Sequence, residues 1–382
     1  LSYIKQHKIR SLLLASALLY YIFCLPKNLF KENYATIVES REGKLLGGKI
    51  APDGQWRFPE RTKVPEKLRE AILTYEDAHF YYHWGVNPIS TLKALGRNLQ
   101  RGRTVRGGST ITQQVIRLAR KNPARSYTEK CIEAIWATRL EFRYSKEHIL
   151  ALYASHAPYG GNVVGVDMAS WRYFGVPPEQ LSWAEACTLA VLPNAPGLIY
   201  PGRNSTSLEK KRNFLLKKLL ENKTIDATTY ELSLTEPLPE KPHELPNIAP
   251  HLVGRVAQKQ AGKRVKTSID YYLQERINQI VSKYYRHYKQ FEVHNMCVLV
   301  ANIQTRQVLA YIGNTPTDAA HQKDVNIIHR PRSTGSVLKP FLYAAMLDSG
   351  ELLPQELVAD VPTHIAGYSP ENFENSYEGA VP

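Results

Sequence analysis

The sequence predicts a mainly α protein in which a helical domain follows an N-terminal apolar helix and precedes the opening of an α+β domain. Three observations predict this order. Residues 11–25 carry no charge, and apolar residues recur at helical spacing from about Pro65 to Leu220. Two short apolar segments, at 296–303 and 308–312, then flank a polar turn, which predicts a β-hairpin.

The N-terminal segment has the charge pattern of a membrane anchor. Basic residues lie within 1–10, and an uncharged run follows. The run is short for a spanning helix, which needs about 20 residues, and it also suits the apolar part of a signal peptide. Because no small-x-small cleavage pattern follows, we expect a cytoplasmic tail at 1–10 and an uncleaved transmembrane signal anchor at 11–26. The basic flank places the rest of the chain outside the cytoplasm.

Composition divides the remaining chain into further segments. Short apolar runs around a turn at Gly43 predict extended structure, and prolines cluster between 236 and 250. The expected segments are a β-like extracytoplasmic stem at 27–59, a helical domain at 60–221, a Pro-rich linker at 222–265 and an α+β region at 266–382.

The chain is basic and its cysteines are dispersed. It has 49 Lys and Arg residues against 35 Asp and Glu residues, which gives a formal net charge of +14. The excess suits a basic soluble surface, an anionic lipid or an anionic substrate. No nucleic-acid-binding motif is present, so we expect no nucleic acid partner. Four cysteines without a CxxC pair predict neither a disulfide framework nor a metal site.

Glu76 is the first candidate catalytic residue. It ends an apolar-faced helix and is followed by the aromatic residues Phe80, Tyr81, Tyr82 and Trp84. Aromatic surroundings lower the local polarity and raise a carboxyl pKa, which suits general acid/base chemistry. The alternative is that Glu76 and Asp77 are solvated charges at a helix end.

A second candidate site begins with two glycines at 107 and 108. Ser109 and Gln114 follow them at a helix start, where backbone N–H groups bind anions, and Arg117 lies near the same face. The alternative is an ordinary glycine-rich turn and helix cap. Lys130 and Glu133 form a further candidate pair on an apolar-periodic helix, for which a plain salt bridge is the alternative.

Taken in order, these segments resemble the peptidoglycan glycosyltransferase domain of class A penicillin-binding proteins, which is lysozyme-like and helical. The resemblance covers about 60–220. The family motifs read E-D-x-x-F-x-x-H-x-G, G-G-S-T-I-T-Q-Q, R-K-x-x-E, K-x-x-I-L-x-x-Y and R-R-N-x-V-L. Their counterparts here begin at Glu76, Gly107, Glu129, Lys146 and Lys211. The phrases at 156–161 and 169–175 resemble the 1C branch of that class.

The resemblance implies inverting glycosyl transfer that polymerises lipid II into glycan strands and releases undecaprenyl pyrophosphate. Glu76 would be the general base that deprotonates the acceptor hydroxyl, and Glu133 would act on the leaving side. The residues expected to face the pyrophosphate or the sugar are Ser109, Gln114, Arg117 and Lys130.

The implied partners are lipid II, the nascent glycan strand and the cytoplasmic membrane. No cofactor is required by the resemblance, although a divalent cation such as Mg²⁺ would suit the pyrophosphate. We expect a single-pass protein whose catalytic domains lie on the periplasmic side.

The chain departs from the family pattern at several positions. Ala78 and Glu129 replace arginines, and Ser155 replaces an asparagine. Arg117 replaces a lysine and keeps its charge. The two lost cations predict weaker pyrophosphate binding, while both catalytic carboxylates are present.

Ser336 and Lys339 form a Ser-x-x-Lys motif, which on a helix places a nucleophile and an amine on one face. The motif also occurs by chance, as at Ser90 and Ser207. Its surroundings resemble the serine penicillin-recognising transpeptidase domain of the same class, in which Ser336 would be the acyl-ester nucleophile and Lys339 its general base.

The transpeptidase region is incomplete in this sequence, because the later S-x-N and K-T-G motifs do not follow Ser336. We therefore expect no transpeptidation, β-lactam binding at Ser336 only if that region is complete, and poor order beyond about residue 260. Two other functions stay open at this point, a lysozyme-like glycan hydrolase and a non-catalytic scaffold for cell-wall synthesis.

Overall fold

The computed structural model describes residues 2–89, 108–124, 126–194, 197, 201–202, 204–372 and 374–381, with side chains from residue 8 onward. The chain forms two compact units, Leu1–Ile328 and His329–Pro382. The first unit contains the predicted helical domain, and the second contains Ser336 and Lys339.

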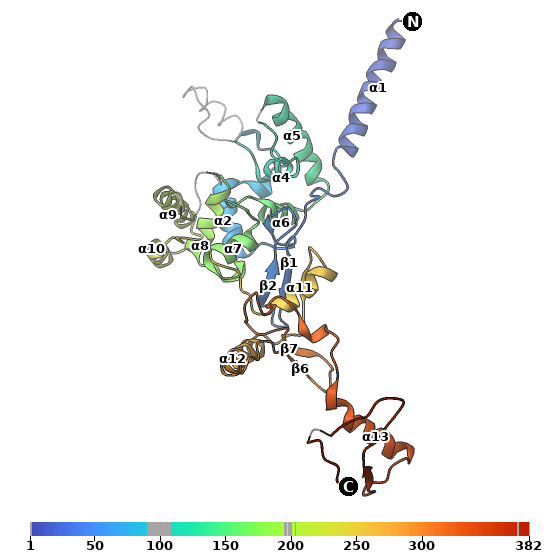
Figure 1. The fold of residues 1–382 in the computed structure, drawn as a ribbon. Helices are drawn as coiled ribbons and strands as arrows, with labels where there is room; N and C mark the ends of the chain where they lie inside the picture. The colour runs from blue at the N-terminus through green and yellow to red at the C-terminus, as the bar shows by residue number, and fades with distance from the viewer. Residues whose placement is uncertain are drawn as a thin grey trace. The chain divides into compact units, whose positions relative to one another are not determined.

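Helices dominate the first unit between 66 and 221, as the periodicity predicts (Figure 1). The described helices are α1 (Ser2–Phe23), α2 (Glu66–Glu76), α4 (Ile111–Ala119), α5 (Tyr127–Glu141), α6 (Lys146–His156), α7 (Val166–Phe174), α8 (Trp183–Val191), α9 (Ser205–Glu221), α10 (Ala227–Thr235), α11 (Pro250–Lys259) and α12 (Tyr271–Tyr288). The strands are β1 (Thr36–Glu39), β2 (Leu45–Lys49), β3 (Trp56–Arg57), β4 (Val163–Val164), β5 (Arg264–Lys266), β6 (Val298–Ala301) and β7 (Val308–Ile312).

Helix α2 positions the first candidate carboxylate. It starts after Pro65, whose fixed φ suits a helix start, and it buries Leu68, Ala71 and Ile72 on one face. That face packs against α8 and α9, while α4 packs against α5 and α6. Glu76 is the last residue of α2, so the core packing of the helix fixes the backbone of the predicted base.

The predicted stem at 27–59 is part of a sheet that is buried on both faces. Strands β2, β1 and β5 lie side by side in that order, with β1 antiparallel to β2 and parallel to β5. Ile37 and Leu45 join the apolar core of the helical domain. Val38 and Leu46 join a second core on the opposite face. Extended structure is confirmed here, but the segment packs into the domain rather than standing apart from it.

The region predicted as a Pro-rich linker, 222–265, contains two helices, and the proline cluster at 236–249 between them has no helix or strand. Helix α10 begins after Asp226, whose side chain caps it by accepting from the Thr229 N–H at 2.6 Å. Helix α11 begins at Pro250, a favoured first helical residue, and buries Val253 in the second core beside β1 and β2 (Figure 1). The prolines therefore flank helices instead of extending the whole segment.

The expectation of poor order beyond about residue 260 is also wrong for the rest of the first unit. Strand β5 pairs with β1, and β6 and β7 form the predicted antiparallel hairpin. The Tyr311 N–H donates to Gln274 Oε1 at 2.7 Å, which ties β7 to α12. Because these contacts bury Ile269 and Tyr311 in the second core, the segment has its own source of stability.

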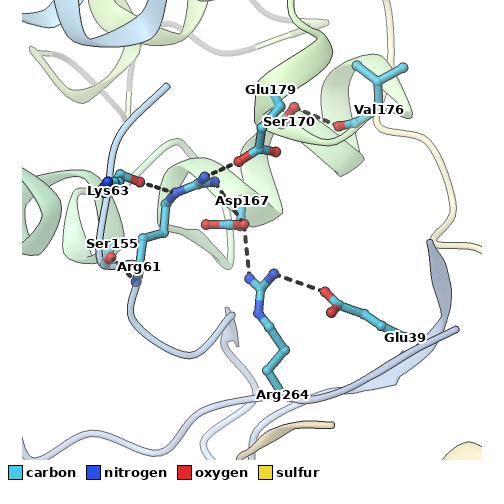
Figure 2. A network of polar contacts seen from close by, with 9 residues as sticks. All are labelled: Glu39, Arg61, Lys63, Ser155, Asp167, Ser170, Val176, Glu179 and Arg264. Carbon is cyan, nitrogen blue, oxygen red and sulfur yellow. Dashed lines mark hydrogen bonds and ion pairs between the residues drawn. The ribbon is translucent and has the colours of Figure 1, made fainter. Parts of the chain in front are cut away.

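A polar network joins β5 to the helical domain (Figure 2). Asp167 Oδ1, near the start of α7, accepts from Arg61 Nη1 at 3.1 Å and from Arg264 Nη2 at 3.0 Å. Arg264 Nη1 donates to Glu39 Oε1 of β1 at 2.9 Å. The Arg61 backbone N–H donates to Ser155 Oγ on α6 at 3.1 Å. Two guanidinium groups therefore depend on one buried carboxylate.

Replacing this carboxylate is expected to destabilise the fold. Asp167→Asn removes the charge that both arginines share, and we expect the free energy of unfolding to fall by about 2 kcal/mol. Urea unfolding measures the change. Glu179→Gln is the matched control, because Glu179 pairs with Arg61 at an exposed position and should change stability by less than about 0.5 kcal/mol. Equal effects of the two substitutions would contradict the special role of Asp167.

The second unit is small and has no buried residue among those described at 329–372 and 374–381. Ser336 lies in a 3₁₀ turn, Gly335–Leu338, and Lys339 begins helix α13 (Lys339–Ser349). Strands β8 (Val358–Asp360) and β9 (Gly379–Val381) pair antiparallel. This unit therefore has no apolar interior of its own in the described residues.

Helix α1 contains most of the predicted anchor and contacts α5. Within the described part of the chain, no helix combines the length and the apolar character needed to cross a membrane, so the predicted anchor at 11–26 is not confirmed. Tyr21 Oη donates to Thr138 Oγ1 at 3.2 Å, and Trp136 Nε1 donates to Tyr20 Oη at 3.3 Å. These bonds join the end of α1 to α5.

Candidate active site

Glu76 is largely enclosed at the end of α2. Gln114 Nε2 of α4 donates to its Oε2 at 2.7 Å, and its Oε1 is buried with no hydrogen-bond partner among the described residues. Burial raises the pKa of the Glu76 carboxyl, and the Asp77 charge adds to the rise. The Gln114 hydrogen bond and the positive charge of Lys211 oppose it. Glu76 thus has one fixed oxygen and one oxygen without a protein partner, which suits a proton acceptor.

Asp77 has a structural role beside Glu76. Its Oδ2 accepts from the Ile111 N–H at 3.1 Å and lies 2.9 Å from His83 Nε2. A carboxylate at a helix start is stabilised by the unpaired N–H groups and the helix dipole. Asp77 is the residue next to Glu76, and it therefore attaches α4, the helix of Gln114, to the end of α2.

Gly85 allows a close approach between this segment and α5. Its φ is +80°, and a Cβ there would lie 2.7 Å from the Ala137 carbonyl carbon and oxygen. Thr110 Oγ1 donates to the Gly85 carbonyl oxygen at 2.6 Å and caps α4 by accepting from the Gln113 N–H. Only glycine fits both the backbone angle and the contact.

Glu133 forms the second charged centre, together with Lys130 and Ser109. Glu133 is 4% exposed on α5, and its Oε2 accepts from Lys130 Nζ at 2.8 Å. The same ammonium group donates to Ser109 Oγ at 2.6 Å. The salt bridge that was the alternative interpretation is therefore present, and it holds a cation against the segment before α4.

Ser109, Lys130 and Glu133 meet in a chain, Gln114 and Glu76 form a pair, and Arg117 lies apart from both. Ser109 contacts Lys130, and Gln114 contacts Glu76, so both carboxylates are connected to the segment 109–114. Arg117 donates from Nη2 to the Pro123 carbonyl oxygen at 3.3 Å. The first glycine of the predicted anion-binding turn, at 107, lies outside the described residues.

Two of the departures from the family pattern have structural partners. Glu129 Oε2 lies 2.7 Å from Arg120 Nη1, so it neutralises a cation at the end of α4. Ser155 accepts the Arg61 N–H and is buried. Ala78 is exposed after α2. Glu129 thus changes the local charge, while Ser155 serves the packing.

Three residues near Glu76 were not singled out as site residues from the sequence. Lys211 of α9 donates to Asn194 Oδ1 at 3.2 Å, and burial lowers its pKa while the Glu76 charge raises it. Tyr153 and Tyr159 are fully buried, and the Glu76 charge adds to the rise that burial causes in the pKa of both phenols. These residues lie in or beside the fourth and fifth family motifs, and this position was the sequence signal that could have identified them.

Ser336 and Lys339 do not form an activated pair in the described residues. Both are exposed, and no hydrogen bond joins the Ser336 hydroxyl to the Lys339 ammonium. Across the described residues, no group of three or more His, Cys, Asp or Glu side chains is placed to hold a metal ion.

Comparison with known proteins assigns the helical domain. Residues 48–220 match the transglycosylase family, a range that contains Glu76, Glu133 and the segment between them. This part of the chain is a transglycosylase domain.

The chain belongs to the class A penicillin-binding proteins, in the 1C-like branch. It is 33% identical to penicillin-binding protein 1C of Escherichia coli K12, over 93% of this chain and 46% of that protein. It is 27% identical to penicillin-binding protein 1B of Vibrio cholerae serotype O1, over 89% of this chain and 47% of that protein. It is 29% identical to penicillin-binding protein 1B of Escherichia coli K12, over 86% of this chain and 42% of that protein. The chain spans slightly less than half the length of these relatives.

Proposed function

We propose that this chain is a peptidoglycan glycosyltransferase that polymerises lipid II and releases undecaprenyl pyrophosphate. One observation supports it above the others: Glu76 is enclosed, has a raised pKa, and keeps one oxygen without a hydrogen-bond partner in the described part of the chain. A raised pKa makes this carboxylate a better proton acceptor, which is what activation of a sugar hydroxyl requires.

In the proposed reaction, Glu76 Oε1 accepts the proton of the acceptor's 4-hydroxyl group. The freed oxygen forms a bond to C1 of the donor sugar, with inversion, while the bond from C1 to the pyrophosphate oxygen breaks. The electron pair of that bond leaves with undecaprenyl pyrophosphate. Gln114 holds the other oxygen of Glu76, so the base is oriented before the substrate arrives.

The proposed role of Lys130 is to stabilise the charge that develops on the leaving pyrophosphate. Its ammonium group is half-exposed and is held between Ser109 Oγ and Glu133 Oε2. A fixed cation stabilises a developing negative charge more than a mobile one, because it needs no reorganisation during the reaction. Glu133 would thus act by positioning Lys130. A divalent cation at the pyrophosphate stays a prediction, and no step is assigned to it.

We further propose that α1 attaches the chain to the cytoplasmic membrane, with the transglycosylase domain on the periplasmic side. The apolar residues of α1 are exposed, and basic residues precede them. The hydrogen bonds of Tyr20 and Tyr21 join α1 to α5, the helix of Lys130 and Glu133. A membrane-bound α1 would therefore keep the site near a substrate with a lipid tail.

Incubating the purified chain with lipid II tests the proposed activity. We expect glycan strands that lengthen with time and a matching release of undecaprenyl pyrophosphate. Isolated cell-wall glycan should keep its length in a parallel incubation. Shortened cell-wall glycan, or no polymer under conditions in which a complete class A protein makes polymer, would count against the assignment.

The second unit should not react with β-lactams in this chain. A serine nucleophile needs its base within about 3 Å, and Ser336 and Lys339 have no such contact. Fluorescent penicillin is expected to leave Ser336 unlabelled, as measured by gel fluorescence and mass spectrometry. A complete class A protein is the positive control. Stoichiometric acylation at Ser336 would contradict this expectation.

A further inference from the structure

Tyr153 and Tyr159 are buried beside the candidate base, and the charge of Glu76 acts on both phenols. Tyr153 and Tyr159 are 1% and 0% exposed, and neither phenol oxygen has a hydrogen-bond partner among the described residues. Glu76 Oε1 is in the same situation. Buried polar atoms are almost always paired, so three exceptions around one carboxylate call for a common explanation.

Packing in the apolar core keeps the phenols from turning toward solvent. The Tyr159 N–H donates to the Val163 carbonyl at 3.0 Å, and Tyr173 Oη donates to the Tyr159 carbonyl at 2.9 Å. Tyr153 lies in the middle of α6, which packs against α4, the helix of Gln114. Both rings belong to the main apolar core. Their hydroxyl groups must therefore find partners inside the domain.

We infer that Tyr153 and Tyr159 are positioning residues for the general base, with phenol hydroxyls that donate to Glu76 Oε1 through buried water. A buried water commonly bridges polar groups that lack a protein partner. The arrangement would fix the second oxygen of Glu76, as Gln114 fixes the first. This inference rests on the proposed role of Glu76.

The charges around Glu76 favour phenols that donate. Burial is the main cause of the raised pKa of both phenols, and the Glu76 charge adds to it, so they keep their protons at neutral pH. Other charged or titratable groups also act on these three residues. Asp77 and Lys211 affect the pKa of Glu76, Tyr75 affects that of Tyr153, and Asp167 affects that of Tyr159. None of the substitutions proposed below changes those groups.

The expected sign follows from hydrogen bonding to the charged form. A donor to the ionised carboxylate lowers its pKa, so loss of the donor raises it. Tyr153→Phe and Tyr159→Phe should each raise the pKa of Glu76 by about one unit or less. Activity needs the ionised base, so the acidic limb of the pH–rate profile should move to higher pH by the same amount.

Carboxyl NMR titration of the full chain, with ¹³C-labelled glutamate, measures the pKa of Glu76 without any substrate. Glu76→Gln assigns the signal. Tyr285→Phe is the matched control, because Tyr285 is a buried tyrosine of α12 that donates to Thr317 at 3.2 Å. We expect an upward shift in the two site variants and no shift in the control.

Thermal unfolding supplies a second, independent readout. A buried phenol hydroxyl without a hydrogen-bond partner destabilises the fold. In that case, Tyr153→Phe would raise the melting temperature. A water-bridged phenol loses hydrogen bonds instead, and the melting temperature should fall. An unchanged Glu76 pKa together with a raised melting temperature would overturn the inference.

The titration also separates this inference from the proposed function. If the chain does not polymerise lipid II but the pKa shift is observed, the phenols position Glu76 and the proposed reaction is wrong. If polymerisation is observed without the shift, the reaction stands and the inference fails. In the expected case, Tyr153→Phe lowers kcat several-fold at pH values on the acidic limb of the pH–rate profile and leaves KM nearly unchanged.

Discussion

Glu76→Gln is expected to lower the rate of glycan polymerisation by about a thousandfold, the usual contribution of a general base. Glutamine keeps the size of the side chain and can still contact Gln114, but its amide cannot accept the proton of the acceptor hydroxyl. Polymer formation from lipid II, followed at several substrate concentrations, measures the loss. The effect should appear in kcat, because the base acts in the chemical step.

The same substitution should not weaken the fold at neutral pH. Burial raises the folded-state pKa of Glu76, so the stability that this group contributes is full at low pH and is lost as the pH rises through that pKa. Glutamine carries no charge and avoids that loss. We expect Glu76→Gln to be at least as stable as the parent near pH 7, with the difference shrinking toward lower pH in urea unfolding. An active variant, or a variant inactive because it is unfolded, would remove the support for Glu76 as the base.

Local features of the sequence were sufficient to predict Glu76 and the order of the helices. The apolar period of α2 is readable within eleven residues, and aromatic residues directly follow its end. The role of Asp77 was not readable, because the Ile111 N–H that it accepts lies 34 positions later. A single sequence does not show which distant groups meet, and this limits prediction at a site built from several helices.

The stem and the linker show the same limit at the level of the fold. Ile37 and Val38 predict a strand, but nothing local indicates that β1 pairs with β5, more than 220 residues later. Proline composition predicted a linker at 222–265, whereas Ala249 and Val253 of this segment are buried in the second core. Long-range burial overrides local composition wherever a second core can form.

Glu133→Gln is expected to lower polymerisation about a hundredfold, the usual effect of losing one transition-state donor. The carboxylate holds Lys130 Nζ at 2.8 Å, and a neutral amide would hold that ammonium less firmly, with Ser109 Oγ as its other acceptor. Lys130 is about half exposed, so its release costs little stability. We therefore expect the loss in activity, measured as polymer formed from lipid II, with a nearly unchanged midpoint of urea unfolding.

Glu141→Gln is the matched control on the same helix. Glu141 is also buried and paired with a lysine, but Lys146 is more enclosed than Lys130, and Thr112 donates to the same carboxylate oxygen at 2.6 Å. Its loss should cost about 1 to 2 kcal/mol of stability and leave most of the activity. The two variants thus separate a charge that acts on the substrate from a charge that joins α5 to α4. If Glu133→Gln lost stability and activity together, as an ordinary structural pair would, Lys130 would have no special place in the reaction.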